Sequence, residues 1–252
     1  MILLLDIGNT RIKWGALIRG ELQAGGVQQR GANDVAKVLA AVKQHHYRPT
    51  RVMVSNVAQD EYRALLTSEM AGHWGCEAEF AVTQAAAFGV VNGYDEPQRL
   101  GVDRWLALIA ARKMVDGALC VVDCGTALTI DLLDSSGAHL GGLIVPGVTL
   151  MQEALVNNTE GLSVVTEWQA KGEGLLMARN TADAISGGAH YSLAALVDRV
   201  ALDARVLLGE NPSVVLTGGG ASALKTHLQC ESQLEPHLVL QGLAISAKEA
   251  SS

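Results

Sequence analysis

The sequence predicts an α/β protein with mixed β-sheets, built from two similar halves. Short apolar segments of strand length alternate with longer segments of helical periodicity, which is the pattern of an α/β chain. The order strand-strand-strand-helix-strand-helix is found twice, with no low-complexity linker between the copies. In each copy the first apolar run ends in Asp-x-Gly, at Asp6 and again at Asp123. We therefore expect two domains, residues 1–116 and 117–252.

The first half is predicted to begin with a three-stranded meander and to continue with alternating helices and strands. Val35, Val38, Leu39 and Val42 have the spacing of one helix face, and Asn33 precedes them as a possible N-cap. Alternating or continuous apolar runs between turn residues indicate the strands. The expected strands are 2–6, 11–17, 21–27, 51–55 and 79–82, and the expected helices are 33–45, 61–70 and 104–115.

The second half repeats the meander and carries longer helices. Turns are expected at Gly125 and at 135–137, between apolar runs. The run 213–217 leads into three consecutive glycines, more than a plain strand-to-helix turn needs. The expected strands are 119–123, 127–133, 139–145 and 213–217, the expected helices are 148–155 and 181–207, and the segment 238–245 closes the chain.

Charge and composition argue against several classes of protein. The 252 residues are 49% apolar, which is enough for a substantial core. A net charge of −7 and a pI near 5.5 argue against nucleic acid or an anionic membrane as the main partner. No apolar run approaches the roughly 20 residues of a membrane span, and the opening segment lacks the basic region of a signal peptide. We expect a cytoplasmic protein.

The common motifs of nucleotide-binding and hydrolytic enzymes are missing. The chain has no G-x-x-x-x-G-K-[ST], no G-x-G-x-x-G after a strand, no H-E-x-x-H and no G-x-S-x-G. The four cysteines show no C-x-x-C spacing, so neither zinc nor a disulfide framework is indicated. For Cys120 and Cys124, which share one face of a predicted strand, core packing is the favoured role.

Both Asp-x-Gly turns have chemistry that suits phosphate. Gly8 and Gly125 allow a tight turn that brings backbone N–H groups close to an anion. Thr10 and Thr126 can donate to phosphate oxygens, and the aspartates can hold a cation or its water shell. Each glycine alone could be an ordinary hairpin glycine, whereas two facing copies in a duplicated fold would form a phosphate clamp. Lys13 could reach a terminal phosphate or could be a solvated strand lysine.

Two predicted helix starts carry polar residues with two possible roles. Asp103 could be the N-cap of its helix, or it could accept a proton while Arg104 binds an anionic group. Thr181 could likewise be an N-cap or a ligand contact. Gly187 and Gly188 follow inside the helical pattern, at a cost of about 1 kcal/mol each relative to Ala, which requires a packing or ligand reason.

Taken together, these motifs resemble the actin-like ATPase superfamily and, within it, the type III pantothenate kinase family. The Asn92-Gly93-Tyr94 segment resembles the Tyr-bearing substrate loop of that family. The resemblance implies two duplicated ribonuclease-H-like domains with an ATP cleft between them. It also implies ATP-dependent phosphorylation of pantothenate, the first step toward coenzyme A. The segments that carry the resemblance, in family order, are 6–10, 101–104, 123–127, 141–147, 180–185 and 217–219.

The resemblance also implies roles for individual residues. Asp103 would be the proton acceptor, Asp123 would ligate a monovalent cation (K⁺ or NH₄⁺), and Mg²⁺ would travel with ATP. Pantothenate would contact Tyr94, Gly101, Val102, Asp103, Arg104 and Thr181. ATP would contact Asp6, Ile7, Gly8, Asn9, Thr10, Arg11, Ile12, Lys13 and Thr126.

A homodimer is expected from the resemblance and from apolar side chains that one small domain would not bury fully. These side chains belong to Leu143, Ile144, Val148, Leu150, Met151 and Leu155.

Two other functions stay open at the level of sequence. A nucleotide- or pantothenate-sensing regulator could use the same fold, and so could another small-metabolite kinase. The intact Asp103 and the two phosphate turns favour the enzyme, and no basic patch indicates DNA contact. Gly220 stands where many relatives carry an acidic residue, which leaves the adenosine contacts open.

Overall fold

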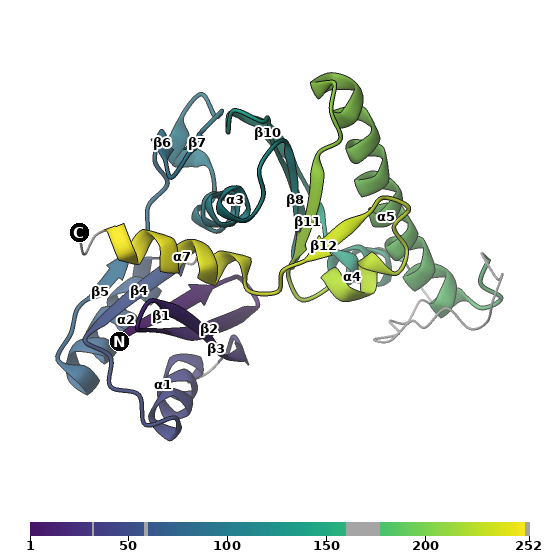
Figure 1. Cartoon of the computed structure of the whole chain (residues 1–252). Coiled ribbons are helices and arrows are strands. Elements are labelled where there is room, and N and C mark those ends of the chain that lie inside the picture. Colours follow the sequence, from purple (N-terminus) through teal and green to yellow (C-terminus); the bar gives the residue numbers. More distant parts are fainter. Residues whose placement is uncertain (32, 58–59, 160–176, 250–252) are drawn as a thin grey trace. The chain divides into compact units, whose positions relative to one another are not determined.

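The structure is a computed structural model of the chain and describes residues 1–31, 33–57, 60–159 and 177–249 (Figure 1). Two five-stranded sheets have the same strand succession, β3-β2-β1-β4-β5 in one and β10-β9-β8-β11-β12 in the other. The predicted α/β class with mixed sheets is confirmed. The first sheet contains β1 (Ile2–Ile7), β2 (Arg11–Ile18), β3 (Glu21–Gln29), β4 (Arg51–Asn56) and β5 (Ala78–Phe80). The second contains β8 (Leu119–Cys124), β9 (Ala127–Leu133), β10 (His139–Pro146), β11 (Ser213–Thr217) and β12 (Ser232–Leu234).

The described contacts divide the chain into two compact units. Unit 1 comprises Met1–Asp116, Gly137–His139 and His237–Ser252, and unit 2 comprises Gly117–Ser136 and Leu140–Pro236. The last helix, α7 (Leu238–Glu249), is therefore part of unit 1, although it lies at the end of the chain. The division into halves at residue 116 stays a prediction about the repeat. No helix among the described residues is long and apolar enough to span a membrane.

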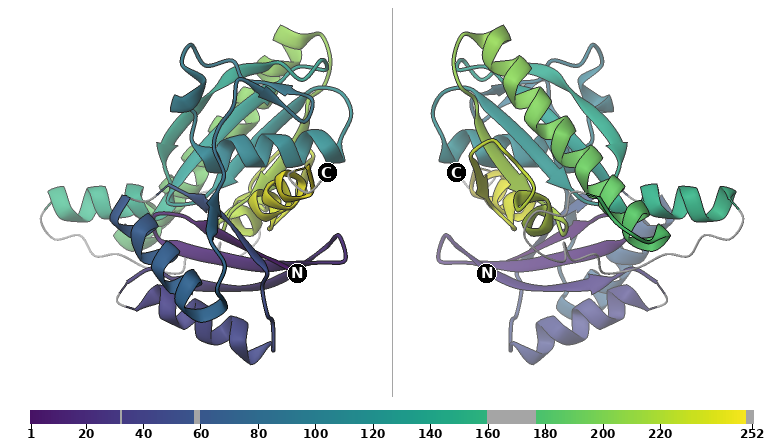
Figure 2. Two further views of the ribbon diagram at one scale, coloured as in Figure 1. Left: turned by 90° about the vertical axis from the view of Figure 1, so that its left-hand side faces the viewer. Right: turned by 90° about the vertical axis from the view of Figure 1, so that its right-hand side faces the viewer.

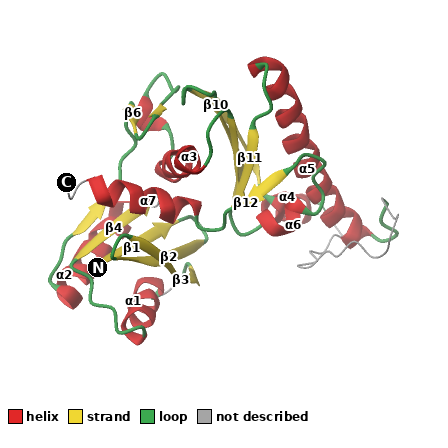
Figure 3. Ribbon diagram, viewed as in Figure 1, coloured by secondary structure: helices red, strands yellow, loops and turns green. Residues whose placement is uncertain are grey.

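In unit 1, helices cover both faces of the sheet. Helices α1 (Asp34–Gln44) and α2 (Asp60–Trp74) lie on one face and α7 on the other (Figures 1 and 3). The core on the α1 side consists of alternate strand residues, among them Leu5 and Val54, and of the predicted apolar face of α1. Asn33 occupies the N-cap position with a left-handed backbone, but its side chain caps nothing. The Asp34 carboxylate instead accepts from the backbone N–H of Val35 at 2.7 Å.

The position of α7 is fixed by close backbone contact and by an ion pair. α7 packs against α3 (Val102–Met114), and a Cβ at Gly242 would lie 2.7 Å from the carbonyl carbon of Leu106. Arg51 makes two hydrogen bonds of 2.7 Å to the Glu79 carboxylate and a third, of 3.3 Å, to the carbonyl of Ala247. The bidentate pair raises the pKa of Arg51 and lowers that of Glu79. Strands β4 and β5 are thereby tied to the end of α7.

In unit 2, the long helix α5 (Thr181–Leu208) packs against one face of the sheet (Figure 2). Its apolar side contacts a core that includes Cys120 and Cys124, the role predicted for these two cysteines. Burial raises the pKa of each thiol to about 12. The shorter helices of unit 2 are α4 (Val148–Asn158) and α6 (Ala221–Lys225). Unit 1 also contains a two-stranded antiparallel ribbon of β6 (Ala86–Ala87) and β7 (Val90–Val91).

Candidate functional site

The first Asp-x-Gly turn connects β1 to β2 in unit 1. The Gly8 N–H donates to the carbonyl of Arg11 at 3.0 Å and closes the turn. Arg30 holds it from the end of β3, since its backbone N–H donates to the Thr10 carbonyl at 2.9 Å and its guanidinium to the Gly8 carbonyl at 3.3 Å. Asn9, Thr10 and Arg11 are exposed, whereas Ile7 and Ile12 are buried in the core. Any contact of these two isoleucines with ATP would therefore use their backbone.

The pairing of the strands determines the neighbours of Asp6. Asp6 lies opposite Lys13 on β2 and opposite Ser55 on β4, and only 9% of it is exposed. Lys13 is therefore placed beside an aspartate, not on a purely solvated strand position. A carboxylate next to an ammonium at the mouth of a phosphate turn can hold a hydrated metal while the lysine neutralises phosphate charge.

The second Asp-x-Gly turn connects β8 to β9 in unit 2 and is one residue shorter. The Gly125 N–H donates to the Ala127 carbonyl at 3.0 Å, which is the counterpart of the bond at Gly8. The Thr126 carbonyl accepts from the N–H of Gly147, and the Cys124 carbonyl accepts from that of Gly220, both at 2.9 Å. The glycine-rich ends of β10 and β11 thus hold this turn through backbone hydrogen bonds.

The Asp123 carboxylate lies in a cradle made by two glycines. A Cβ at Gly218 would overlap Asp123 Oδ1 and would lie 2.6 Å from the carbonyl carbon of Cys124. A Cβ at Gly125 would lie 3.5 Å from the same Oδ1. Gly218 also has a backbone φ of 91°, a conformation that residues other than glycine rarely adopt. Gly218, the first of the three consecutive glycines, is therefore needed because its backbone lies so close to the Asp123 carboxylate.

A third group of predicted residues gathers at the start of α3. Gly101 is the N-cap of this helix, so the interpretation of Asp103 as the N-cap is wrong. Asp103 instead occupies the first turn, where its Oδ1 accepts from the N–H of Arg104 at 2.8 Å. A Cβ at Gly101 would lie only 2.6 Å from this Oδ1. The glycine therefore leaves room for the carboxylate, and the helix N-terminus favours its negative charge.

Arg104 connects the helix start to the loop that carries Tyr94. Only 7% of Arg104 is exposed, and its Nη1 donates to the Tyr94 hydroxyl at 2.8 Å. The Tyr94 ring stacks on His139, with 5.9 Å between centroids and 14° between planes. Asn92 fixes the loop by accepting from the Tyr94 N–H at 3.0 Å and donating to the carbonyl of Pro97, also at 3.0 Å. The structure thus brings Tyr94, Asp103 and Arg104 together in unit 1.

Thr181 lies in unit 2, as the first residue of α5. The N-cap is Asn180, whose side-chain oxygen accepts from the Asp183 N–H at 2.8 Å, so the capping interpretation of Thr181 is wrong. Its exposed side chain is left for another role. The predicted residues therefore divide between the units: the first turn, Tyr94 and 101–104 belong to unit 1, and Asp123, Thr126 and Thr181 belong to unit 2.

Sequence reasoning missed several residues around these groups. Asn92 belongs to the Asn92-Gly93-Tyr94 segment, but the sequence predicts no role for it. Its Asn-Gly pair is the sequence signal for a fixed turn. His139 gave no signal, because its contact with Tyr94 depends on distant segments meeting. Ser55 and Thr217 are hydroxyl residues at predicted strand ends, and the structure shows that these strands pair with the strands of the two aspartates.

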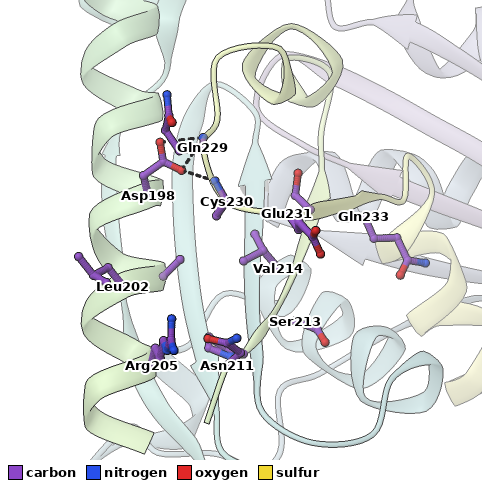
Figure 4. A pocket seen from close by; sticks show the side chains of 13 residues that line it. Asp198, Leu202, Arg205, Asn211, Ser213, Val214, Gln229, Cys230, Glu231 and Gln233 are labelled. Carbon is purple, nitrogen blue, oxygen red and sulfur yellow. Dashed lines mark hydrogen bonds between the residues drawn. The ribbon is translucent and has the colours of Figure 1, made fainter. Parts of the chain in front are cut away.

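A pocket of about 790 Å³ lies in unit 2, and none of the predicted site residues lines it. Its wall is formed by α5, at Asp198 and Leu202, and by the segment around Cys230 (Figure 4). The Asp198 carboxylate accepts from the backbone N–H groups of Gln229 and Cys230 at 3.0 Å. Burial, with Asp198 adding to it, raises the pKa of Cys230 to about 11, so this thiol is a poor nucleophile at neutral pH.

Comparison with known proteins identifies a family that matches most of the chain. The sequence profile described as "Type III pantothenate kinase" matches residues 2–203. A type III pantothenate kinase of Nitrosococcus oceani is 39% identical over 256 residues, which cover 100% of this chain and 95% of the relative. One of an Azoarcus species is 41% identical over 258 residues, covering 98% of this chain and 90% of the relative.

Solved structures match the fold over nearly the whole chain. A Campylobacter jejuni protein described as a Baf family transcriptional activator has a TM-score of 0.62 at 20% identity, covering 99% of this chain and 98% of that one. A Sinorhizobium meliloti protein described as a 2-dehydro-3-deoxygalactonokinase has a TM-score of 0.56 at 14% identity, covering 99% of both. At such identities the likeness shows the fold alone, and it confirms the predicted actin-like ATPase fold.

Proposed function

The chain belongs to the type III pantothenate kinase family, and we propose that Asp103 is the base of its reaction. The enzyme phosphorylates pantothenate with ATP, in coenzyme A biosynthesis. The observation that supports the assignment of Asp103 is its position in the first turn of α3, beside an arginine that Tyr94 holds in place. The hydrogen bond from the Arg104 N–H fixes the direction of this carboxylate.

In the proposed reaction, Asp103 accepts the proton of the primary hydroxyl of pantothenate as that oxygen attacks the γ-phosphorus of ATP. The bond to the bridging oxygen breaks and ADP leaves with the electron pair. Such a transfer requires positioning and charge neutralisation more than covalent chemistry. Arg104 and Tyr94 would hold pantothenate together with the backbone of Gly101 and Val102, and Thr181 would add a contact from α5.

ATP phosphates would bind at the two Asp-x-Gly turns. In unit 1, the exposed Asn9, Thr10 and Arg11 and the more buried Lys13 supply donors and positive charge. In unit 2, the exposed Thr126 supplies a hydroxyl next to the Gly125 backbone. Among the described residues no three His, Cys, Asp or Glu side chains gather as a metal site. In our proposal Mg²⁺ arrives with ATP as part of the substrate, near Asp6.

The residues around Asp123 fit a monovalent cation. K⁺ and NH₄⁺ interact with oxygen atoms, and the half-buried carboxylate of Asp123 lies against the glycine cradle at the end of β8. Thr217, on the neighbouring strand, carries a buried hydroxyl with no hydrogen-bond partner among the described residues. A bound cation would supply positive charge that offsets repulsion between Asp123 and phosphate.

Replacing Asp103 by Asn tests the assignment of the base. Asp103→Asn keeps the shape and the oxygen that accepts from Arg104 N–H, but it cannot accept the hydroxyl proton. We expect kcat to fall by about 10²-fold or more, with Tm unchanged. Asp116→Asn, an exposed carboxylate beyond the other end of α3, is the control and should keep wild-type kcat. A kcat above about a tenth of wild type in Asp103→Asn would refute the role of base.

A homodimer is the second part of the proposal, and the structure narrows the surface that could form it. Val148 and Met151 of the predicted patch pack against the core of unit 2. The other four residues are exposed, namely Leu143 (46%), Ile144 (61%), Leu150 (37%) and Leu155 (45%). Large apolar side chains exposed on β10 and α4 support an interface that involves these two elements.

Light scattering tests the dimer directly. We expect twice the monomer mass for the wild type at micromolar concentration, and monomer mass for Ile144→Asp with its far-UV spectrum retained. Val206→Asp, at an exposed apolar position on α5 (79% exposed), should stay dimeric. A wild type that scatters as a monomer would rule out the dimer. The cytoplasmic location stays a prediction.

A further inference from the structure

One arginine just after the end of β3 holds two carbonyls of the first Asp-x-Gly turn. The Arg30 guanidinium donates from Nη1 to the Gly8 carbonyl at 3.3 Å, and the Arg30 backbone N–H donates to the Thr10 carbonyl at 2.9 Å. A peptide unit is planar and trans, so its C=O and its N–H point in opposite directions. The N–H groups of Asn9 and Arg11 therefore point away from Arg30. Backbone N–H groups directed in this way are the donors that bind phosphate oxygens.

Arg30 is in turn held by a buried carboxylate. Asp34, in the first turn of α1, is only 4% exposed, and its Oδ2 lies 3.7 Å from the Nε of Arg30. The Asp34 carboxylate also accepts from the backbone N–H groups of Val35 at 2.7 Å and of Gly31 at 3.3 Å. A buried carboxylate is costly unless it is paired and hydrogen-bonded, and both conditions are met here. Asp34 therefore offsets the charge of Arg30 within the chain.

An aromatic ring from α2 completes the surroundings of the guanidinium. The Cζ of Arg30 lies 4.5 Å from the centroid of the Tyr62 ring, within the range of a cation–π contact. Burial, with Asp34 adding to it, raises the pKa of the Tyr62 hydroxyl, so this hydroxyl is neutral at physiological pH. The end of β3, α1 and α2 therefore fix one guanidinium beside the turn.

We propose that Arg30 is a positioning residue for ATP, and that Asp34 and Tyr62 fix its guanidinium for this task. Arg30 acts by directing the N–H groups of the first turn toward the phosphates. Its charge, offset by Asp34, is not its contribution. The inference rests on the proposed phosphate role of this turn.

The test measures binding of the β,γ-imido analogue of ATP, with Mg²⁺, to the full-length enzyme by isothermal titration calorimetry. We expect Arg30→Lys to raise the dissociation constant by about tenfold or more, the effect of losing one hydrogen bond to a charged group. Lysine keeps the positive charge but lacks the planar fork that reaches Gly8 and Asp34 together. The KM for pantothenate should stay unchanged, because the first turn contacts only ATP in our proposal.

Asp34→Asn separates positioning from charge by the sign of its effect. The variant keeps the shape of the side chain and an oxygen for the Val35 N–H, but it loses the charge that holds Arg30. Positioning predicts weaker binding of the analogue, by about threefold or more, the effect of losing an ion pair. Tighter binding would show that the charge of Arg30 acts on ATP directly and would overturn the proposal. Unchanged binding with a lower Tm would reduce the pair to a structural role and would also overturn it.

Tyr62 offers a matched pair of variants that leaves the ion pair in place. Tyr62→Phe keeps the ring over the guanidinium and should bind the analogue as the wild type does. Tyr62→Leu loses the ring and should bind it more weakly. Equal binding by the two variants would overturn the part assigned to Tyr62.

Lys13→Ala separates a failure of this inference from a failure of the proposed site. If Lys13→Ala weakens binding of the analogue and Arg30→Lys does not, the positioning role is overturned and the phosphate turn stands. If neither variant changes binding, both are overturned. Arg199→Ala, which removes an arginine from an exposed ion pair on α5, is the control and should bind as the wild type does. Tm and far-UV circular dichroism check that each variant is folded.

Discussion

The two Asp-x-Gly turns have the same place in their sheets but different surroundings. Asp6 has a lysine opposite it on the antiparallel strand, whereas Asp123 has Thr129 at the equivalent position. The first turn is held by the side chain and backbone of Arg30, and the second by backbone contacts to glycines. The two sheets therefore keep the position of the carboxylate and differ in the residue that lies opposite it.

We expect this difference to give the two turns different tasks. A turn with a lysine ammonium beside it needs no added K⁺ to attract phosphate. A turn lined by hydroxyls and backbone favours an exogenous cation of suitable size. We expect unit 1 to set the affinity for ATP and unit 2 to set the dependence on K⁺. The predictions below compare matched positions of the two turns.

The largest effect is expected from removing each aspartate. Asp123→Ala should lower kcat in saturating K⁺ by about 10²-fold or more, and the remaining activity should no longer respond to K⁺. Asp6→Ala should lose a similar factor but should keep the K⁺ response of the wild type. Steady-state rates in potassium and choline buffers check both variants. An identical response to K⁺ in the two variants would break the assignment of separate tasks.

A smaller effect follows from transplanting the lysine. Thr129→Lys places an ammonium opposite Asp123, as Lys13 stands opposite Asp6. We expect activity without K⁺ to rise by about tenfold, because a fixed charge near the carboxylate replaces the bound ion. Lys248→Thr, an exposed charge change on α7, should leave the K⁺ response unchanged. A full K⁺ requirement in Thr129→Lys would contradict the comparison.

The smallest expected effect is on the stability of the fold, and it compares a glycine beside the second turn with a glycine in the first. Gly218→Ala should destabilise the fold by more than about 2 kcal/mol, because φ is 91° and the new Cβ would overlap Asp123 and Cys124. In Gly8→Ala the new Cβ would lie 3.3 Å from the Arg11 carbonyl, a tight contact that local adjustment can relieve. Its cost should stay below about 1 kcal/mol. Urea denaturation measures both, and equal costs would be inconsistent with the cradle.

Much of the site could be predicted from local sequence. The local sequence predicts where Asp6, Asp123 and Asp103 lie, because each stands in a local pattern of a strand end or a helix start with glycine nearby, whereas their roles stay predictions. The contact of Tyr94 with Arg104 follows from a loop that lies close in sequence to α3. His139, by contrast, lies in the second half of the sequence. It stacks on Tyr94 because the segment Gly137–His139 packs with unit 1. No local pattern encodes such a meeting.

The sequence by itself determined the repeated strand order, the two Asp-x-Gly turns and the position of Asp103 at the start of a helix, because hydrophobic periodicity and turn residues act over a few neighbouring positions. Tertiary structure alone decided that α7 packs on unit 1, that Gly218 cradles Asp123, and that Ser55 and Thr217 are buried beside the two aspartates. These features depend on strand register and on backbone approach between distant segments. Register is a property of paired strands, and a single strand's sequence does not contain it.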